Sequence, residues 1–179
     1  MSAPSAVDTQ TPLNIFNECH VGIVRRLKAL DELPALLEPA ARAREIAERS
    51  LEFFREAIFE HHLEEERELF PAVMASAEPG AELARVKGMA ARLTEEHRSI
   101  ERLWKSLERG LKQVAKGQAA SLDVDDLHHL VAEYQRHASF EETEFLPLAQ
   151  DILGRNSNHL AALGLSLHMR HVKPVNAYI

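Results

Sequence analysis

Apolar residues recur in alternating steps of three and four along four long stretches of the chain, a pattern typical of helices that bury one face. Proline and glycine separate these stretches. Pro79-Gly80 follows the second stretch, Gly117 is expected to cap the third in a left-handed conformation, and Ser121 or Asp123 caps the fourth. The expected helices span residues 12–31, 40–77 and 81–116 and a fourth stretch that ends at 154, with the proline-containing segment 31–39 as the first connection.

The apolar seam of each expected helix is interrupted at one place by residues that can bind a metal. His20 is the polar member of the first seam, and His97 is the polar member of the third. In the second and fourth seams the interruption is a His-x-x-x-Glu motif, whose spacing puts both side chains on one helical face. The two motifs are His61 with Glu65 and His137 with Glu141.

An internal repeat relates the two halves of the chain. Residues 61–71 match residues 137–147 at histidine, three glutamates and proline, and residues 18–23 match residues 95–100 at glutamate, histidine and isoleucine. The chain therefore reads as two copies of one helical hairpin. Stacked together, two such hairpins predict an all-α fold, an up-down-up-down antiparallel four-helix bundle over residues 13–154 with a C-terminal extension at 155–179. The approximate two-fold symmetry brings the seam interruptions to one central point.

Buried glutamates in an apolar seam are costly unless something neutralises them. A cation would do so, and six imidazole and carboxylate ligands exceed the four of a tetrahedral zinc site, so they suit a pair of first-row transition metals. For one His-x-x-x-Glu motif alone, a solvated charge pair is the simpler interpretation. Two motifs in register with two seam histidines favour a metal centre built from His20, His61, Glu65, His97, His137 and Glu141.

Composition and charge exclude several other classes of protein. The chain is rich in alanine, leucine and glutamate, which favours helix, and its single cysteine excludes a disulfide framework or a cysteine-based metal cage within one chain. A net charge of -7 argues against binding to nucleic acid or to an anionic membrane surface. No apolar stretch approaches the roughly 20 residues of a membrane-spanning helix, and residues 1–12 do not resemble a secretory signal, so a cytoplasmic location is expected.

The six proposed ligands, with Leu69-Phe70-Pro71 closing the first motif, resemble a hemerythrin-like (HHE cation-binding) domain of the bacterial type over about residues 13–154. This resemblance implies a non-haem di-iron centre inside an up-down four-helix bundle. It implies two iron ions per chain, an oxo or hydroxo bridge as one option between them, and Glu65 and Glu141 as bridging carboxylates. Ferritin-like di-iron proteins are less similar, because their motif is Glu-x-x-His, in the opposite order and with a spacing of three.

The chain departs from the oxygen-carrying hemerythrins at two positions. Those proteins have a fifth histidine and an aspartate where this chain has Glu101 and Glu142. The departure argues against simple reversible oxygen carriage, and the set is more similar to bacterial hemerythrin-like proteins linked to nitric oxide, oxidative stress and the repair of iron centres. Glu101 is either a seventh ligand, a gate over the open position or an exposed surface residue, and Glu142 is a weaker rival to Glu141.

Three functions stay open on the sequence alone. The first is a di-iron protein that binds or senses a small diatomic or peroxide ligand, namely dioxygen, nitric oxide or peroxide. The second is an enzyme that reduces nitric oxide or peroxide, or repairs iron centres, at the same site. The third is a metal-free helical interaction module with an unidentified protein partner.

The other histidines are not expected to belong to the centre. His62, His128 and His129 fall off the seams and are expected at the surface. His168 and His171 lie in the tail at 155–179, which has room for one more short helix.

Overall fold

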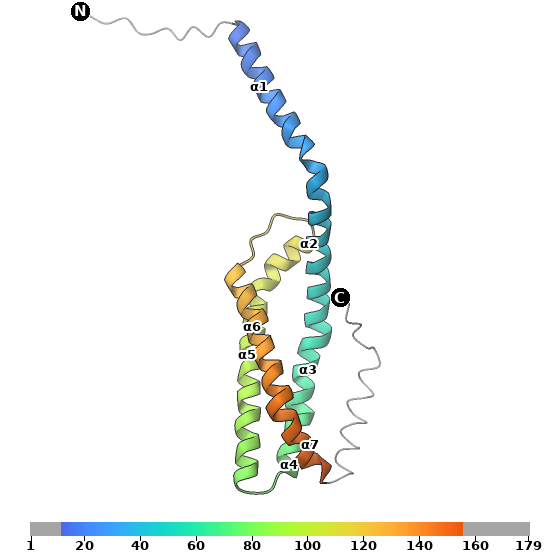
Figure 1. Ribbon diagram of the computed structural model, residues 1–179, viewed down its shortest axis with the longest axis vertical. Coiled ribbons are helices and arrows are strands. Elements are labelled where there is room, and N and C mark those ends of the chain that lie inside the picture. The colour runs from blue at the N-terminus through green and yellow to red at the C-terminus, as the bar shows by residue number, and fades with distance from the viewer. Residues whose placement is uncertain (1–11, 156–179) are drawn as a thin grey trace, which may run out of the picture. The chain divides into compact units, whose positions relative to one another are not determined.

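The computed structural model describes residues 12–155, and every regular element in that range is helical (Figure 1), which confirms the all-α prediction. The chain divides into two compact units, Met1–Glu45 and Ile46–Ile179. The tail helix predicted beyond residue 155, with His168 and His171, lies outside the described residues. The elements are α1 (Pro12–Asp31), α2 (Leu33–Phe53), the π-helical turn η1 (Phe54–Ile58), α3 (Phe59–Glu64), η2 (Glu65–Leu69), α4 (Phe70–Ser76), α5 (Ala81–Ala115), α6 (Val124–Phe140), η3 (Glu141–Phe145) and α7 (Leu146–Gly154).

The first helix, α1, has the predicted bounds, but the predicted connection after it is wrong. Instead of a loop over 31–39, α2 begins at Leu33 and runs through Pro34 and Pro39. Pro34 lies in the first turn, where a backbone N–H has no helical acceptor to lose. Pro39 removes one hydrogen bond from the helix interior, but the surrounding leucine and alanine residues are strong helix formers, and the helix stays continuous.

Two π-helical turns of the C-terminal unit repeat at the spacing of the two sequence motifs. η2 begins at Glu65 and η3 begins at Glu141, and Pro71 and Pro147 each follow six residues later. A proline ring inside a helix clashes with the carbonyl group four residues earlier, and in both helices that carbonyl group belongs to the π turn. Both helices continue past their prolines, and the internal repeat seen in the sequence is also present in the backbone.

The π turn at η2 changes which residues of its helix are buried. In steps of four and three from Glu65, the apolar seam of this helix would continue through Leu69 and Ala72, but both of these are only partly buried. The fully buried positions are Phe70 and Val73. Because a π turn contains one residue more than an α turn, it advances the buried stripe by one position.

The other helix ends follow their sequence signals. Gly80 precedes α5 with φ +110°, and Gly117 follows it with φ +66°, both in the region that favours glycine. Asp123 is the N-cap of α6, since its carboxylate accepts hydrogen bonds from the backbone N–H groups two and three residues later. The last described helix ends at Gly154, as predicted.

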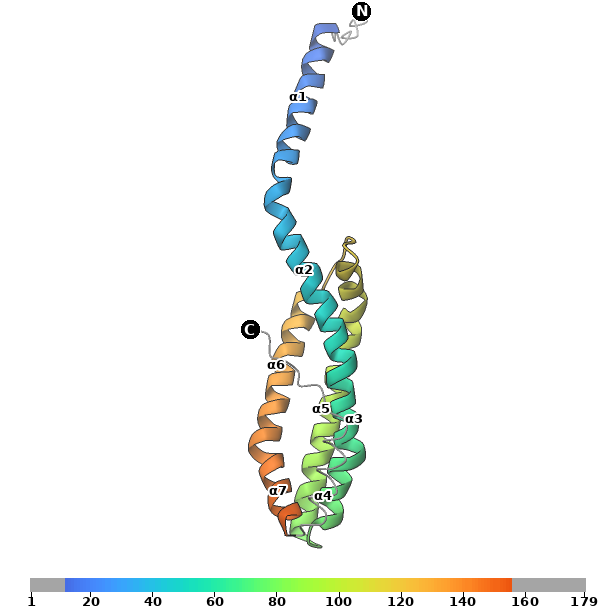
Figure 2. The same ribbon diagram turned by 90° about the vertical axis from the view of Figure 1, so that its right-hand side faces the viewer.

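The helices of the C-terminal unit enclose a core that a polar layer divides. α5 packs against α4 and α6, and α4 packs against α7; both views show these segments side by side (Figures 1 and 2). One apolar cluster is built around Leu93 and Phe145, and the other is built around Ile100 and Trp104. Along α5 the buried His97 separates the two clusters. Within residues 12–155, no helix is long and apolar enough to cross a membrane.

Candidate metal centre

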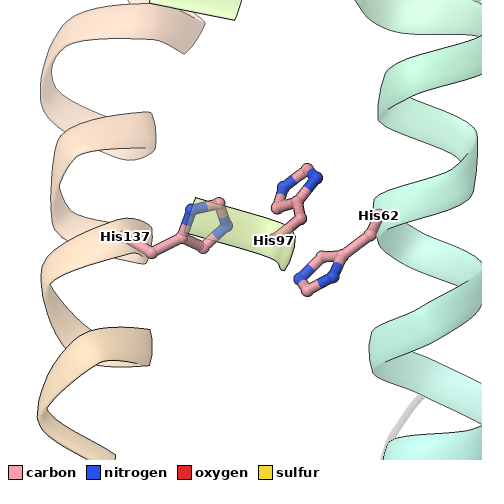
Figure 3. A group of neighbouring side chains, drawn as sticks. All are labelled: His62, His97 and His137. Atoms are coloured by element: carbon pink, nitrogen blue, oxygen red, sulfur yellow. The ribbon is translucent and has the colours of Figure 1, made fainter. Parts of the chain in front are cut away.

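Three buried histidines from three helices converge in the polar layer. His62 comes from α3, His97 from α5 and His137 from α6, and each side chain points into the same space (Figure 3). Their exposed fractions are 1%, 0% and 1%. The ring centroids of His97 and His137 are 4.8 Å apart, and one nitrogen of each of the three rings lies within 4.8 Å of the others. This geometry brings three ligand nitrogens within reach of a shared ion.

A second group lies beside the first and contains two carboxylates. His61, Glu65 and Glu141 each offer a ligand atom, and these atoms also lie within 4.8 Å of one another. Glu65 connects the two groups, because its Oε1 is 3.1 Å from His61 Nε2 and its Oε2 is 3.1 Å from His97 Nε2. Glu141 Oε2 lies 3.9 Å from His137 Nε2. Five of the six predicted ligands are therefore close together.

The buried position of His62 corrects the expectation that it lies at the surface. In steps of three and four, the seam of this helix would pass from Ile58 through His61 to Glu65. At about 100° per residue, positions 61 and 62 lie roughly 60° and 40° to either side of Ile58, so a helix can turn both toward the same interior. The structure buries His62 and leaves the His61 side chain 45% exposed. The adjacent pair of histidines was the signal in the sequence. A seam with one residue per turn includes only one of them, whereas the buried face of the helix is wide enough for both.

The ligand atoms have the property expected of a metal site, since they are buried and have few polar neighbours outside their own group. Within the described residues, no hydrogen-bond partner exists for Nε2 of His137 or either ring nitrogen of His62. The oxygens of Glu65 contact only other members of the group, including Nε2 of His97 at 3.1 Å. Buried polar atoms are almost always satisfied, and leaving them unpaired costs stability. Imidazole nitrogens with carboxylate oxygens are a donor set that first-row transition metals favour. The residues present therefore fit a bound metal.

Two further glutamates contact Nδ1 of His97 and Nδ1 of His137, the ring nitrogens that do not face the ligand group. His97 Nδ1 is 2.8 Å from Glu66 Oε1, and the other oxygen of Glu66 accepts from Arg98. His137 Nδ1 is 3.2 Å from Glu96 Oε2. A hydrogen bond donated by Nδ1 to a carboxylate leaves Nε2 unprotonated and aimed at the centre. Sequence reasoning missed these glutamates, because each lies on a different helix from the histidine that it contacts.

The electrostatics of the layer suit a cation. Burial, reinforced by His97, lowers the pKa of His62 to about 3, and burial also lowers the pKa of His137, so both rings are neutral at pH 7. Burial, together with the neighbouring Glu65, raises the pKa of Glu141. Burial acts in the same direction on Glu65, but His97 and Glu141 outweigh it and lower the pKa of Glu65. The carboxyl pair therefore holds one proton, which a cation would replace.

The remaining candidates lie outside these two groups. Glu101 is partly exposed and pairs with Arg98 at 2.8 Å, and Glu142 is exposed whereas Glu141 is buried. His20 lies in α1, in the N-terminal unit, and is exposed, so it is not among the ligands that the structure brings together. The expected surface positions of His128 and His129 are confirmed.

Comparison with known proteins agrees with this site. The family model of the hemerythrin HHE cation-binding domain matches residues 11–149. An uncharacterized protein of Haemophilus influenzae is 25% identical over 158 residues, which cover 84% of this chain and 88% of that protein. No solved structure matches with significance. Since the family match covers most of the chain, and the converging histidines and glutamates lie within it, the chain belongs to the hemerythrin HHE cation-binding domain family.

Proposed function

We propose that this chain is a non-haem di-iron protein that binds or senses a small diatomic or peroxide ligand, namely dioxygen, nitric oxide or a peroxide. The observation that carries the proposal is the layer of buried imidazole nitrogens and carboxylate oxygens that face one another between two apolar clusters. Several buried ionisable groups that face one another point to function. Membership of a cation-binding family supports a metal as their partner.

The proposed ligands are the six residues that interrupt the apolar seams: His20, His61, Glu65, His97, His137 and Glu141. For His20 to take part, α1 must pack as the fourth helix of an up-down-up-down antiparallel bundle over residues 13–154, with 155–179 as an extension. The family match supports this arrangement, because it begins at residue 11 and so includes α1. The seam of α1 supports it too, since Ile23, Leu27 and Leu30 are exposed apolar residues that such packing would bury.

The protein contributes ligands of fixed charge and a site shielded by apolar residues. Two irons bound there would supply the redox chemistry and an open coordination position for the small ligand. The imidazoles offer ring nitrogens, Glu65 reaches both ligand groups with separate oxygens, and the apolar clusters on either side limit access of water. Iron as the metal, two ions per chain and the cytoplasmic location stay predictions.

The proposal is tested by anaerobic reconstitution with ferrous iron, metal analysis and an optical spectrum before and after exposure to dioxygen or nitric oxide. We expect two irons per chain, an absorption change on ligand addition, and loss of iron in Glu65→Ala and His97→Ala. Negligible iron in the wild-type chain, with no difference in the variants, would contradict the proposal. Steady turnover of peroxide or nitric oxide that disappears in Glu65→Ala would instead make the protein an enzyme.

A further inference from the structure

His62 belongs to neither His-x-x-x-Glu motif, yet it is among the most buried side chains of the centre. Its residue exposure is 1%, and neither of its ring nitrogens has a hydrogen-bond partner among the described residues. Its ring lies parallel to that of His97, with 3.9 Å between centroids and 6° between planes, and 5.6 Å from the ring of His137. The imidazole thus gains ring contacts here, but no hydrogen bond.

A packing role alone does not explain why this position holds histidine. A phenylalanine could stack on His97 equally well and would bury no unpaired nitrogen, whereas an imidazole without partners lowers the stability of the metal-free fold. The aromatic neighbours of His62 are His61, His97, His137 and Tyr134, and three of these are themselves imidazoles. A nitrogen that is buried, unpaired and next to other unpaired nitrogens has the surroundings of a metal ligand.

We propose that His62 is a metal ligand and that it forms, with His97 and His137, an all-imidazole position beside the carboxylate-rich position of His61, Glu65 and Glu141. This inference rests on the proposed function, because it concerns the ligands of the same centre. It adds a seventh ligand to the proposed set and makes the two metal positions chemically different.

The geometry of α3 separates the two positions. Consecutive residues on a helix point about 100° apart, so His61 and His62 cannot easily reach one ion together. Their ring centroids are 6.2 Å apart, and each ring faces a different group. Glu65 lies between the groups, with one oxygen 3.1 Å from His61 Nε2 and the other 3.1 Å from His97 Nε2. The helix therefore offers one histidine to each position and one carboxylate to both.

Ligand chemistry makes the two positions unequal. Imidazole suits zinc, copper, iron, nickel and cobalt, whereas carboxylate oxygen favours harder ions. A chain with a three-nitrogen position and a mixed nitrogen and oxygen position is expected to fill them in two steps rather than one. Divalent cobalt is a suitable probe, because its absorption reports the type and number of its ligands.

The test compares the full-length wild-type chain with His62→Phe. The apolar ring keeps the stacking on His97 and removes both nitrogens. The exposed His128→Phe is the matched control, and His97→Phe tests the centre as a whole. Cobalt bound per chain, the d–d absorption spectrum and the imidazole count from X-ray absorption are measured, together with urea unfolding of each metal-free chain.

For His62→Phe we expect metal-free stability equal to or above that of the wild type, and the loss of one cobalt phase. The affinity of that phase should fall by at least about tenfold, since even the loss of an outer partner of a metal ligand has an effect of that size. His128→Phe should match the wild type. If His62→Phe does not fold, His62→Gln, which keeps a polar side chain of similar size, is measured in the same way.

Two results would overturn the inference. The first leaves the proposed function intact, and the second contradicts it as well. If His62→Phe binds cobalt as the wild type does and only its metal-free stability falls, His62 is a packing residue and the proposed metal centre stands. If the wild type binds neither iron nor cobalt and His97→Phe changes nothing, the proposed function fails together with this inference.

Discussion

At the scale of a single residue, Glu141 shows how a buried carboxyl group stays protonated in the metal-free chain. The residue is 6% exposed and its carboxyl group faces Glu65, so burial and the second carboxylate raise its pKa and keep it protonated well above the usual range of a glutamate. The motif predicted a ligand at this position. It did not indicate which of the two glutamates would be neutral, because that depends on contacts between side chains of different helices.

We expect Glu141→Gln to stabilise the metal-free chain at alkaline pH. The pKa of Glu141 is raised on folding, so its contribution to stability is full below about 4.5 and is lost as pH rises toward the folded value. Glutamine cannot ionise and carries no such loss. At pH 8 the variant should exceed the wild type by about 1 kcal/mol or more, the equivalent of one pKa unit. Urea unfolding at pH 5 and pH 8 measures this difference.

The adjacent Glu142→Gln is the control for that comparison, because Glu142 is exposed and should show little effect at either pH. An equal pH dependence in the wild type and Glu141→Gln would show that Glu141 is ionised in the metal-free fold. The proposed function requires the opposite effect on binding, since Glu141→Gln should also lose metal.

Glu66 should affect the centre without binding the metal itself. It accepts the hydrogen bond from His97 Nδ1 and is itself held by Arg98. In Glu66→Ala the ring loses the partner that fixes its orientation, and metal affinity should fall by roughly tenfold to a hundredfold. Competition with a chelator of known affinity measures the change. Glu95→Ala, at an exposed position two residues before His97, should leave the affinity unchanged, and an unchanged affinity in Glu66→Ala would contradict this role.

At the scale of helices, the sequence predicted most ends but not the interior turns. Gly117 and Asp123 act where their chemistry indicates, and His97 lies in the predicted seam. The π turns were not predicted, because such a turn has no residue signature of its own. It only shifts the buried stripe of the helix by one position. The predicted connection at 31–39 was wrong, because the helix-forming leucine and alanine residues of this segment outweigh the effect of its two prolines.

Two glycines of α5 should respond to alanine in opposite ways. A Cβ added at Gly110 would lie 2.9 Å from the backbone oxygen of Ser121 and 2.6 Å from the side chain of Leu122, so the segment before α6 would have to move. A Cβ at Gly88 would meet no atom within 4 Å. Gly110→Ala should therefore lower the free energy of unfolding by about 1–3 kcal/mol. Gly88→Ala should raise it by about 0.5–1 kcal/mol, because alanine favours helix.

Urea unfolding of the two variants and the wild type under the same conditions measures both effects. Since both glycines belong to one helix, a general effect of alanine on α5 would give the same sign twice. Stabilisation by Gly110→Ala would show that the segment at Ser121 yields without cost.

At the scale of the whole molecule, the participation of α1 and His20 in the centre is a prediction. The sequence assigned His20 to the same layer as His97 through the internal repeat, whereas the structure places it in a separate unit. Sequence periodicity shows which face of α1 is apolar, but not what covers that face. The family match across both units is the reason to expect a single bundle.

Hydrogen exchange can test this expectation on the full chain. If α1 packs beside the centre and His20 binds metal, backbone amides within α1 should exchange more slowly after iron loading. In His20→Ala that added protection should disappear, while the protection of α5 around His97 remains. Equal exchange of α1 with and without iron in the wild type would contradict both the packing and the role of His20.

The polar layer between the two apolar clusters also bears on folding cooperativity. Without metal, each cluster is a small core of its own, and the layer between them contains buried nitrogens, including both of His62, that have no hydrogen-bond partner. A bound cation would be coordinated by residues from α3, α5 and α6. It would therefore cross-link parts of the chain that are tens of residues apart, as a covalent cross-link does. With the proposed centre filled, the two apolar clusters would then unfold as one cooperative unit, so that loss of iron and unfolding occur together.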